Sequence, residues 1–401
     1  MALLSVEDAL AQVLDQVEPL EAETVPLRLA HHRVLARDIA ALRTQPPFAA
    51  SAMDGYAVRS ADLDIGRPLR LIGEAAAGQG FGGSLGHGEC VRIFTGAPIP
   101  DGADTILIQE HVRIEGETII PTHDTDRLRH IRPAGLDFKQ GDVMLATGQR
   151  LSASSLSLVA AMGHPHCLVT RKPRVAILAT GDELVQPGET CGPDQIVASN
   201  HFAVAAMVEA LGGIAIDLGI AKDTHEALEA AFQSAEDQQA DVLVTLGGAS
   251  VGDRDLVQSS LAQRGMTLGF WRIAMRPGKP LIFGSLGRMR ILGLPGNPVS
   301  SIICAQIFLG PLLKCLSGDT TARQDPTCQA VLGCDLKGND LRQDYMRARI
   351  TGTYQGLPMV VPFSSQDSSM LGLMSQAQAL LIREPFAPAA QMHDPCRVIL
   401  L

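Results

Sequence analysis

Apolar residues near the start of the chain recur at the spacing of a helix. Ala9, Val13 and Val17 lie four residues apart, so they would share one helix face. Ser5 precedes them and Asp8 follows it by three residues, a pair that satisfies free amides in a first helical turn. The pattern therefore predicts a helix close to the N-terminus.

Two later segments extend this region. Apolar residues recur through 25–39, and a helical pattern covers 151–162, bounded by a serine and a glycine that are typical helix start and stop residues. The chain between these two segments has a different period. We therefore interpret 1–45 and 133–172 as a single discontinuous helical linker domain.

Short apolar runs of the β type dominate two other regions. In 46–132 they are separated by glycine-rich turns, which predicts a small β domain inserted into the linker domain. The predicted strands there are 69–72, 91–94, 105–108 and 118–120. Similar runs return at 348–353 and 357–361, which predicts a small β-barrel or sandwich over 319–401.

Strands and helices alternate over 173–318. The predicted strands are 175–179, 214–218, 241–246, 281–284 and 291–294, and the predicted helices are 200–211, 225–237, 255–264 and 298–316. Alternation of this kind is typical of a mostly parallel sheet with helices on both faces. We therefore expect a doubly wound α/β domain here, and a multidomain α/β protein as a whole.

Composition narrows the function classes. The chain has 33 Lys and Arg against 43 Asp and Glu, a formal charge of −10, which argues against a nucleic-acid partner. Its eight cysteines show no Cys-x-x-Cys spacing, so we expect reduced thiols rather than a zinc motif. The first residues lack the features of a signal peptide, and no apolar run approaches the roughly eighteen residues of a membrane span. These features predict a cytoplasmic protein without a membrane segment.

Three glycine-rich turns lie within 242–300. They read Leu246-Gly-Gly-Ala-Ser-Val-Gly-Asp-Arg-Asp255, Arg276-Pro-Gly-Lys-Pro280 and Gly293-Leu-Pro-Gly-Asn-Pro298. Glycine lets backbone amides approach a ligand closely, and open α/β sheets bind ligands at the edge where such turns gather. Arg276 and Lys279 would supply local positive charge in an acidic chain. The turns therefore predict an anion site.

Polar residues in these turns have both functional and plain structural interpretations. Asn297 and Pro298 would begin a helix whose free amides bind an oxyanion, or would simply cap it. Asp253 and Asp255 would hold Mg²⁺ beside a phosphate, or would cap the next helix. Glu183, in Thr180-Gly-Asp-Glu-Leu184, would be a general base or metal ligand, or part of a solvated turn.

The same turns resemble the signature of the MoeA-type molybdopterin molybdenumtransferases, a family to which the E domain of gephyrin is related. Further segments match that family in the same order: Pro46-Pro-Phe48, Ser51-Ala-Met-Asp-Gly-Tyr-Ala57, Arg92-Ile-Phe-Thr-Gly-Ala97 and Thr180-Gly-Asp-Glu-Leu184. The resemblance spans roughly residues 5 to 385. It implies a molybdopterin-binding-like α/β domain over 173–318 and favours a C-terminal β-barrel over a sandwich.

The resemblance also implies an activity. A cytoplasmic homodimer would insert molybdate into adenylylated molybdopterin and release AMP with Mg²⁺ assistance, in an active site at the subunit interface. Transient contacts with molybdopterin adenylyltransferase and with apo-molybdoenzymes would follow. No nucleic acid and no membrane would take part.

The matched motifs carry the implied site residues. Catalytic roles fall to Asp54, Thr95, Glu183 and Asp255, and metal binding to Glu183, Asp253 and Asp255. Binding of the pterin substrate and its anions falls to Thr180, Gly181, Gly247, Gly248, Ser250, Arg276, Pro277, Gly278, Lys279, Pro295, Gly296, Asn297 and Arg347.

Departures from the family pattern leave alternatives open. Ala49, Ala50 and Ala198 stand where the family usually has Asp, Asn and Asp; Arg276 replaces a usual lysine, and Asp367 a usual glycine. A weakened paralogue acting as a molybdopterin-binding or partner-binding scaffold would fit these changes. A molybdopterin adenylyltransferase is the other alternative, because the α/β domain also resembles that enzyme.

Overall fold

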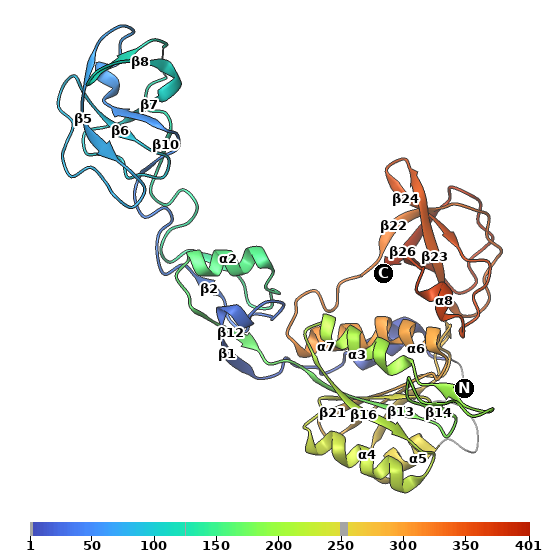
Figure 1. Ribbon diagram of the computed structural model, residues 1–401. Coiled ribbons are helices and arrows are strands. Elements are labelled where there is room, and N and C mark those ends of the chain that lie inside the picture. The colour runs from blue at the N-terminus through green and yellow to red at the C-terminus, as the bar shows by residue number, and fades with distance from the viewer. Residues whose placement is uncertain (1–2, 125, 249–255) are drawn as a thin grey trace.

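The chain folds into four parts that are strung out along an elongated molecule, as a computed structural model shows (Figure 1). The structure describes residues 3–124, 126–248 and 256–401. The inserted β domain lies at one end, the linker domain follows it, and the α/β domain carries the C-terminal barrel at the other end. The fold class expected from the sequence is confirmed.

The linker domain contains more strand than the sequence predicts. Its elements are β1 (Ala22–Pro26), η1 (Leu27–Leu29), β2 (Ile39–Ala40), β11 (Val143–Leu145), α2 (Ala153–Ala161) and β12 (His166–Thr170). β1 pairs with β12 and β2 with β11, so both halves of the discontinuous domain meet in each sheet. Segment 25–39 is therefore not an α-helix; its only helical part among the described elements is the single turn η1. Pro26 ends β1 in an extended conformation, and the amide of Leu27 is satisfied by the Pro165 carbonyl instead of by a helical partner.

The first helix, α1 (Val6–Val13), belongs to a different part of the molecule than expected. It begins as predicted, because the Ser5 hydroxyl accepts a hydrogen bond from the Asp8 amide at 3.0 Å. Its buried face, Val6, Ala9 and Val13, packs into the core of the α/β domain. The expectation that 1–45 lies wholly in the linker domain is thus wrong for this helix. Helical spacing identifies a buried face but not the surface that covers it.

The inserted β domain is a six-stranded sheet in the order β7-β4-β6-β5-β9-β8. Its strands are β4 (Gly55–Val58), β5 (Leu69–Ala75), β6 (Glu89–Ile93), β7 (Thr105–Ile108), β8 (Val112–Glu115) and β9 (Thr118–Pro121), with turns η2 (Ser60–Asp62) and η3 (Gln109–His111). Short strands β3 (Ala50–Ser51) and β10 (Ile131–Arg132) pair at its base. Alternate residues of β4 enter two separate cores, Tyr56 and Val58 in one and Ala57 in the other, so both faces of the sheet are covered.

The α/β domain has a six-stranded sheet in the order β16-β13-β17-β21-β20-β18, of which the first four strands are parallel. Its strands are β13 (Arg174–Thr180), β16 (Ile214–Ala221), β17 (Val242–Leu246), β18 (Thr267–Trp271), β20 (Ile282–Leu286) and β21 (Met289–Leu294), with a small pair, β14 (Leu184–Val185) and β15 (Ile196–Val197). Val175 and Ile177 face one core, and Ala176 and Leu178 face the other. This alternation places helices on both faces of the sheet.

Helices α3 (Asn200–Ala210), α6 (Pro298–Cys304) and α7 (Gly310–Leu316) cover one face, and α4 (His225–Asp237) and α5 (Leu256–Gln263) cover the other. The segment Pro298–Leu316 is continuous through a π-type stretch, η4 (Ala305–Leu309). It is long and apolar enough to cross a membrane, which corrects the expectation that no segment approaches that length. However, 72% of its apolar 18-residue stretch is buried inside the protein, as in a core helix.

The C-terminal domain is a closed barrel. Its strands are β22 (Cys328–Leu332), β23 (Gln343–Tyr354), β24 (Leu357–Pro362), β25 (Ala379–Arg383) and β26 (Pro395–Leu400), with a short helix α8 (Leu371–Met374). The strands run in the order β23-β24-β22-β26-β25, and β25 pairs again with β23. Strand β19 (Met275–Arg276) of the preceding domain pairs in parallel with the start of β23, so the barrel is joined to the α/β domain by backbone hydrogen bonds.

Candidate functional site

A cavity of about 820 Å³ opens at the carboxyl ends of the parallel strands. Strands β13, β17 and β21 end there; α3, the helix after β13, lies on one face of the sheet, and α5, the helix after β17, lies on the other (Figure 1). Such a switch point is where open α/β folds bind ligands. Predicted residues that line the cavity are Thr180, Gly181, Glu183, Gly247, Gly248, Pro295, Gly296 and Asn297. Segments more than a hundred residues apart therefore meet as expected.

Thr180, Gly181 and Glu183 form the wall that follows β13. Gly181 has a φ of +146°, and a Cβ there would lie 2.4 Å from Glu183 Oε2. The glycine thus leaves the room in which the Glu183 carboxylate folds back over the main chain. Glu183 is exposed and lines the cavity. Thr180 is 4% exposed, and its hydroxyl finds no hydrogen-bond partner within the described residues.

The turn after β17 forms the facing wall. A Cβ on Gly248, whose φ is +62°, would lie 2.3 Å from Val257 Cγ2, so a side chain here would displace α5. Gly247 lies against Thr180 on the adjacent strand. The close packing explains why two successive glycines stand at this strand end. Three predicted site residues of the same loop, Ser250, Asp253 and Asp255, fall outside the described residues.

The third wall is the start of the helix at Pro298. Asn297 occupies the N-cap position, but its side chain makes no capping hydrogen bond. The Val299 amide donates instead to the Ser368 carbonyl, a residue of the barrel, at 3.1 Å. Asn200 Nδ2 ties α3 to the same turn through the Gly296 carbonyl at 2.7 Å. The helix start therefore faces the cavity as predicted, with one of its amides already taken.

Sequence reasoning missed Asp223, Asn200 and Ser369, which also line the cavity. Burial, followed by the charges of Asp182 and Glu183, raises the pKa of Asp223 above its ordinary value. Asp223 could have been found from its position two residues past the end of β16. Because Ala221 of β16 pairs in parallel with Thr180, residues after β16 reach the same edge of the sheet as the predicted site. Ser369 falls in 364–370, a segment that resembles a family loop near the site, and Asn200 falls in the family segment 198–200, so each had a signal in the sequence but was assigned no role.

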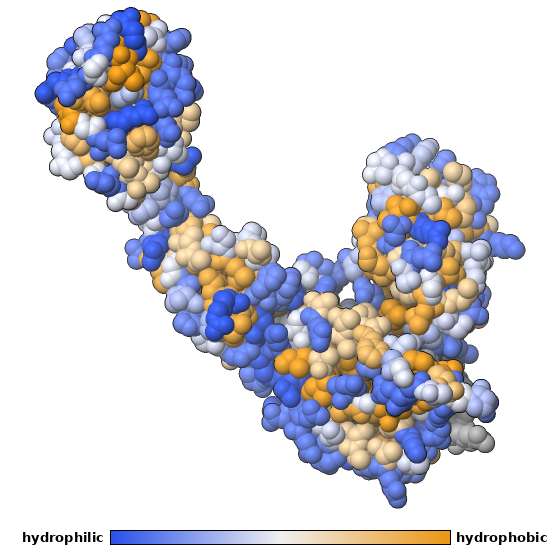
Figure 2. Space-filling view, in the orientation of Figure 1, coloured by the Kyte–Doolittle hydropathy of each residue, from blue (hydrophilic) through white to orange (hydrophobic). Residues whose placement is uncertain are grey.

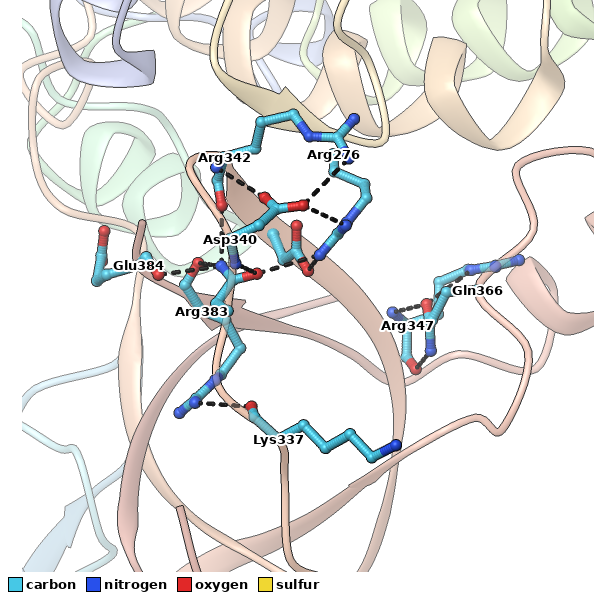
Figure 3. A network of polar contacts seen from close by, with 10 residues as sticks. Arg276, Lys337, Asp340, Arg342, Arg347, Gln366, Arg383 and Glu384 are labelled. Carbon is cyan, nitrogen blue, oxygen red and sulfur yellow. Dashed lines mark hydrogen bonds and ion pairs between the residues drawn. The ribbon is translucent and has the colours of Figure 1, made fainter. Parts of the chain in front are cut away.

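Arg276 does not line the cavity, contrary to the predicted role. Its guanidinium donates to Asp340 at 2.9 Å, to Asn339 Oδ1 at 3.1 Å and to Asp344, all in the barrel (Figure 3). Hydrogen bonding to Asp344 raises the pKa of Arg276 further above its usual value. Arg276 therefore holds the barrel against the α/β domain. A cation already paired with two carboxylates has little attraction left for a substrate anion.

The rest of this turn stays close to the cavity. Pro277 follows a cis peptide bond, and Gly278 is buried beside Cys304. Lys279 is exposed and directly precedes Pro280, which lines the cavity. Of the two predicted cations of the turn, Lys279 is thus the one placed to reach a bound anion.

Replacing Arg276 with alanine is expected to lower the free energy of unfolding by about 1–2 kcal/mol, since the buried Asp344 carboxylate loses its partner. The effect falls short of a fully buried pair because the Arg276 side chain is 42% exposed. Arg397→Ala is the control, because Arg397 makes only exposed ion pairs within the barrel. Calorimetric melting of both variants measures the difference; equal melting temperatures would contradict the role assigned to Arg276.

Arg347 is also placed differently from its predicted role. It is 1% exposed, and its guanidinium donates to the carbonyls of Met370 at 3.1 Å, Asp367 at 2.9 Å and Ser365 at 3.4 Å. Burial lowers the pKa of Arg347 from its ordinary value. The guanidinium is therefore hydrogen-bonded to the backbone of one barrel loop, and Arg347 does not line the cavity.

Asp54 and Thr95 meet each other in the inserted β domain. The Thr95 amide and hydroxyl both donate to Asp54 Oδ1 at 2.7 Å. The backbone hydrogen bond from Thr95, and then the hydroxyl bond, lower the pKa of Asp54. The pair lies at the far end of the molecule from the cavity (Figure 1). One chain therefore does not bring Asp54 and Thr95 to the predicted residues that line the described cavity.

Replacing Thr95 with valine is expected to raise the pKa of Asp54 without restoring its ordinary value. The hydroxyl donor is lost, but the amide donor, the larger cause of the lowered pKa, remains. NMR titration of the Asp54 carboxyl carbon in wild type and variant measures the change. An unchanged pKa would show that the hydroxyl bond has no effect on the carboxylate.

Comparison with known proteins covers nearly the whole chain. Residues 4–163 match the MoeA N-terminal region (domain I and II), 176–315 a probable molybdopterin binding domain, and 329–395 the MoeA C-terminal region (domain IV). A Haemophilus influenzae protein named molybdopterin molybdenumtransferase is 35% identical over 384 residues, 95% of each chain. A Nostoc protein of the same name is 36% identical over 78% of this chain and 74% of its own.

Solved structures agree in fold along the full length. A crystal structure of the molybdopterin biosynthesis MoeA protein from Pyrococcus horikoshii OT3 superimposes with a TM-score of 0.83 at 26% identity, covering 100% of both chains. A cavity at the α/β switch point, a barrel that closes one side of it and a distant β domain thus occur together with a full-length match in sequence. The chain belongs to the MoeA family of molybdopterin molybdenumtransferases.

Proposed function

We propose that this protein inserts molybdenum from molybdate into adenylylated molybdopterin and releases AMP, as a soluble cytoplasmic enzyme of molybdenum cofactor synthesis. The observation that carries the proposal is the cavity at the switch point, which combines a helix start, glycine turns and an exposed carboxylate. Its volume of about 820 Å³ suits a ligand of nucleotide size. Curated relatives named for this activity support it.

The roles follow from the chemistry of the lining. Backbone amides at the helix start, with Lys279 nearby, would bind phosphate and molybdate oxygens. The Thr180 hydroxyl is buried behind the Gly247–Gly248 turn and has no partner within the described chain, so it belongs to the wall of the cavity and does not contact the ligand directly. Fixed dipoles and charges of this kind stabilise charge that develops during transfer.

A magnesium ion would suit the carboxylate side of the cavity. No cluster of three or more His, Cys, Asp or Glu suited to a metal occurs among the residues that the structure describes. Mg²⁺ needs only one or two carboxylates when phosphate oxygens and waters complete its shell, and Glu183 can provide one. The ion would neutralise phosphate charge, while Glu183 would orient it toward the cavity.

A homodimer would complete the site. Asp54 and Thr95 lie too far along the molecule to act in the cavity of their own chain, so they would act in the cavity of a second copy. The linker domain, the β domain and the segments that join them carry exposed apolar side chains that a second copy would cover. They are Leu42, Phe48, Met53, Leu128, Leu136 and Val143. Hydrophobic side chains also gather over α3 on the visible face (Figure 2).

Reconstitution of an apo-molybdoenzyme tests the proposal. Purified protein, adenylylated molybdopterin, molybdate and Mg²⁺ should restore activity and release one AMP per insertion. Molybdopterin with MgATP in place of the adenylylated form should not. Adenylate formation by this chain alone would instead favour an adenylyltransferase.

A binding protein with little turnover is the second candidate. Ala198, 5% exposed in the cavity wall, puts a methyl group where a carboxylate is usual in the family. This candidate predicts tight binding of the adenylylated pterin without AMP release, so the same experiment separates the two.

A further inference from the structure

The barrel supplies part of the cavity wall. Ser369, which lies in the loop 363–370 after β24, lines the cavity beside the helix that starts at Pro298. The preceding residue, Ser368, accepts the hydrogen bond from the Val299 amide at 3.1 Å. This barrel loop is therefore seated directly on the helix start, and its position fixes where Ser369 meets a ligand.

Gln366 holds the loop to the barrel through its side-chain amide. Gln366 Oε1 accepts from the Arg347 amide at 2.9 Å, and Gln366 Nε2 donates to the carbonyls of Arg347 and Phe363 at 3.0 Å each. The side chain thus pairs with β23 as another strand would. Figure 3 shows Arg347 and Gln366 facing each other, apart from the cluster around Arg276. The Arg347 guanidinium also donates hydrogen bonds to three carbonyls of the loop.

The Ser369 hydroxyl already donates its hydrogen bond within the loop, to the Asp367 carboxylate. Both the hydroxyl and the amide of Ser369 donate to Asp367 Oδ1, at 2.7 and 2.9 Å. These bonds lower the pKa of Asp367, so its carboxylate stays ionised at neutral pH. The Ser369 oxygen is left with lone pairs only, and the nearby charge repels anions. What it presents to the cavity is therefore a hydrogen-bond acceptor.

We infer that Gln366 is a positioning residue that sets Ser369 as an acceptor for a donor group of the substrate, an amine of its heterocycles or a ribose hydroxyl. The inference rests on the proposed function and extends it. Molybdate has no such donor at neutral pH, so the barrel loop would discriminate among organic substrates and leave the oxyanion to the helix start.

Steady-state kinetics of Gln366→Ala in the reconstitution assay tests this inference. The KM for adenylylated molybdopterin is expected to rise about tenfold, as for loss of one well-placed hydrogen bond, with kcat and the molybdate KM within about twofold. Gln376→Ala is the matched control, because Gln376 is also hydrogen-bonded within the barrel but does not line the cavity. It should behave as wild type.

A double-mutant cycle shows whether Gln366 acts through Ser369. Ser369→Ala should reproduce the rise in KM, and the double variant should be no worse than either single one. AMP as a competitive inhibitor locates the donor: weaker inhibition of Ser369→Ala places it on the nucleotide, and unchanged inhibition places it on the pterin.

Other outcomes would overturn the inference. The inference would be overturned if the rises in KM of the two single variants multiplied in the double variant. A changed KM for molybdate, or wild-type kinetics of Gln366→Ala, would also overturn it. If Gln366→Ala does not fold, Gln366→Glu, which keeps the acceptor for the Arg347 amide, serves with Ser369→Ala in the same cycle. An inactive wild type would instead refute the proposed function itself, so the two failures are distinguishable.

Discussion

Molybdenum insertion by a Glu183→Ala variant is expected to fall at least about a hundredfold, the usual cost of removing a preorganised charged group from a reaction centre. Among the residues that the structure describes, Glu183 is the predicted catalytic carboxylate that lines the cavity, and the fold keeps room for it over Gly181. Because the side chain is exposed and not required for packing, the variant should fold normally.

Reconstitution of an apo-molybdoenzyme measures this loss. Glu189→Ala is the control, since Glu189 lies in the following loop outside the cavity and only accepts from the Gln186 amide at 2.9 Å. Thermal melting of both variants should match the wild type. Full activity of a folded Glu183→Ala protein would remove this carboxylate from the mechanism.

Mixing inactive Asp54→Ala and Glu183→Ala subunits is expected to restore about a quarter of the wild-type activity, if each site combines residues of two chains in a symmetric dimer. Half of the randomly assembled dimers would be mixed. Each mixed dimer would hold one site with both residues intact and one site with neither. The gain is large because both starting proteins would be nearly inactive.

The subunits would be exchanged by mild denaturation and renaturation, and activity followed against the mixing ratio. Each variant carried alone through the same treatment is the control. No recovery above the two controls, in mixtures shown by mass spectrometry to contain mixed dimers, would place Asp54 and Glu183 in a site of one chain or outside any site. The distance between the two domains within one chain argues for recovery.

Local patterns predicted most elements of the α/β domain. Helix α4 (His225–Asp237) has the bounds expected from its apolar period, and the strands that end at Thr180 and Leu246 lie where the buried runs predicted them. The two strands are buried along nearly their whole length and stand out as continuous apolar runs, whereas α4 buries one face at helical spacing. Segment 25–39 was assigned to a helical region, but it contains the end of β1, the turn η1 and the start of β2. Strands this short bury too few residues to show a two-residue period in the sequence.

The predicted site residues fall into two groups: those that local sequence placed correctly at the cavity, and those that the structure places elsewhere. Turns that end parallel strands reach one edge by topology, so Gly181, Gly247 and Asn297 could be assigned from sequence. Arg276 and Arg347 could not, because their guanidinium groups donate to barrel residues between Asn339 and Met370. A sequence shows that a cation is available near a turn, but not which nearby oxygen binds it.

The sequence by itself determined the order of the elements, the glycine turns and the family, because each depends on residues that are close along the chain. Tertiary structure alone decided that α1 packs on the α/β domain, that Arg276 joins two domains, and that the Ser368 carbonyl accepts a hydrogen bond from the Val299 amide. These contacts arise between surfaces distant in sequence. Their partners are selected by the burial and hydrogen bonding of the whole fold, which no local period records.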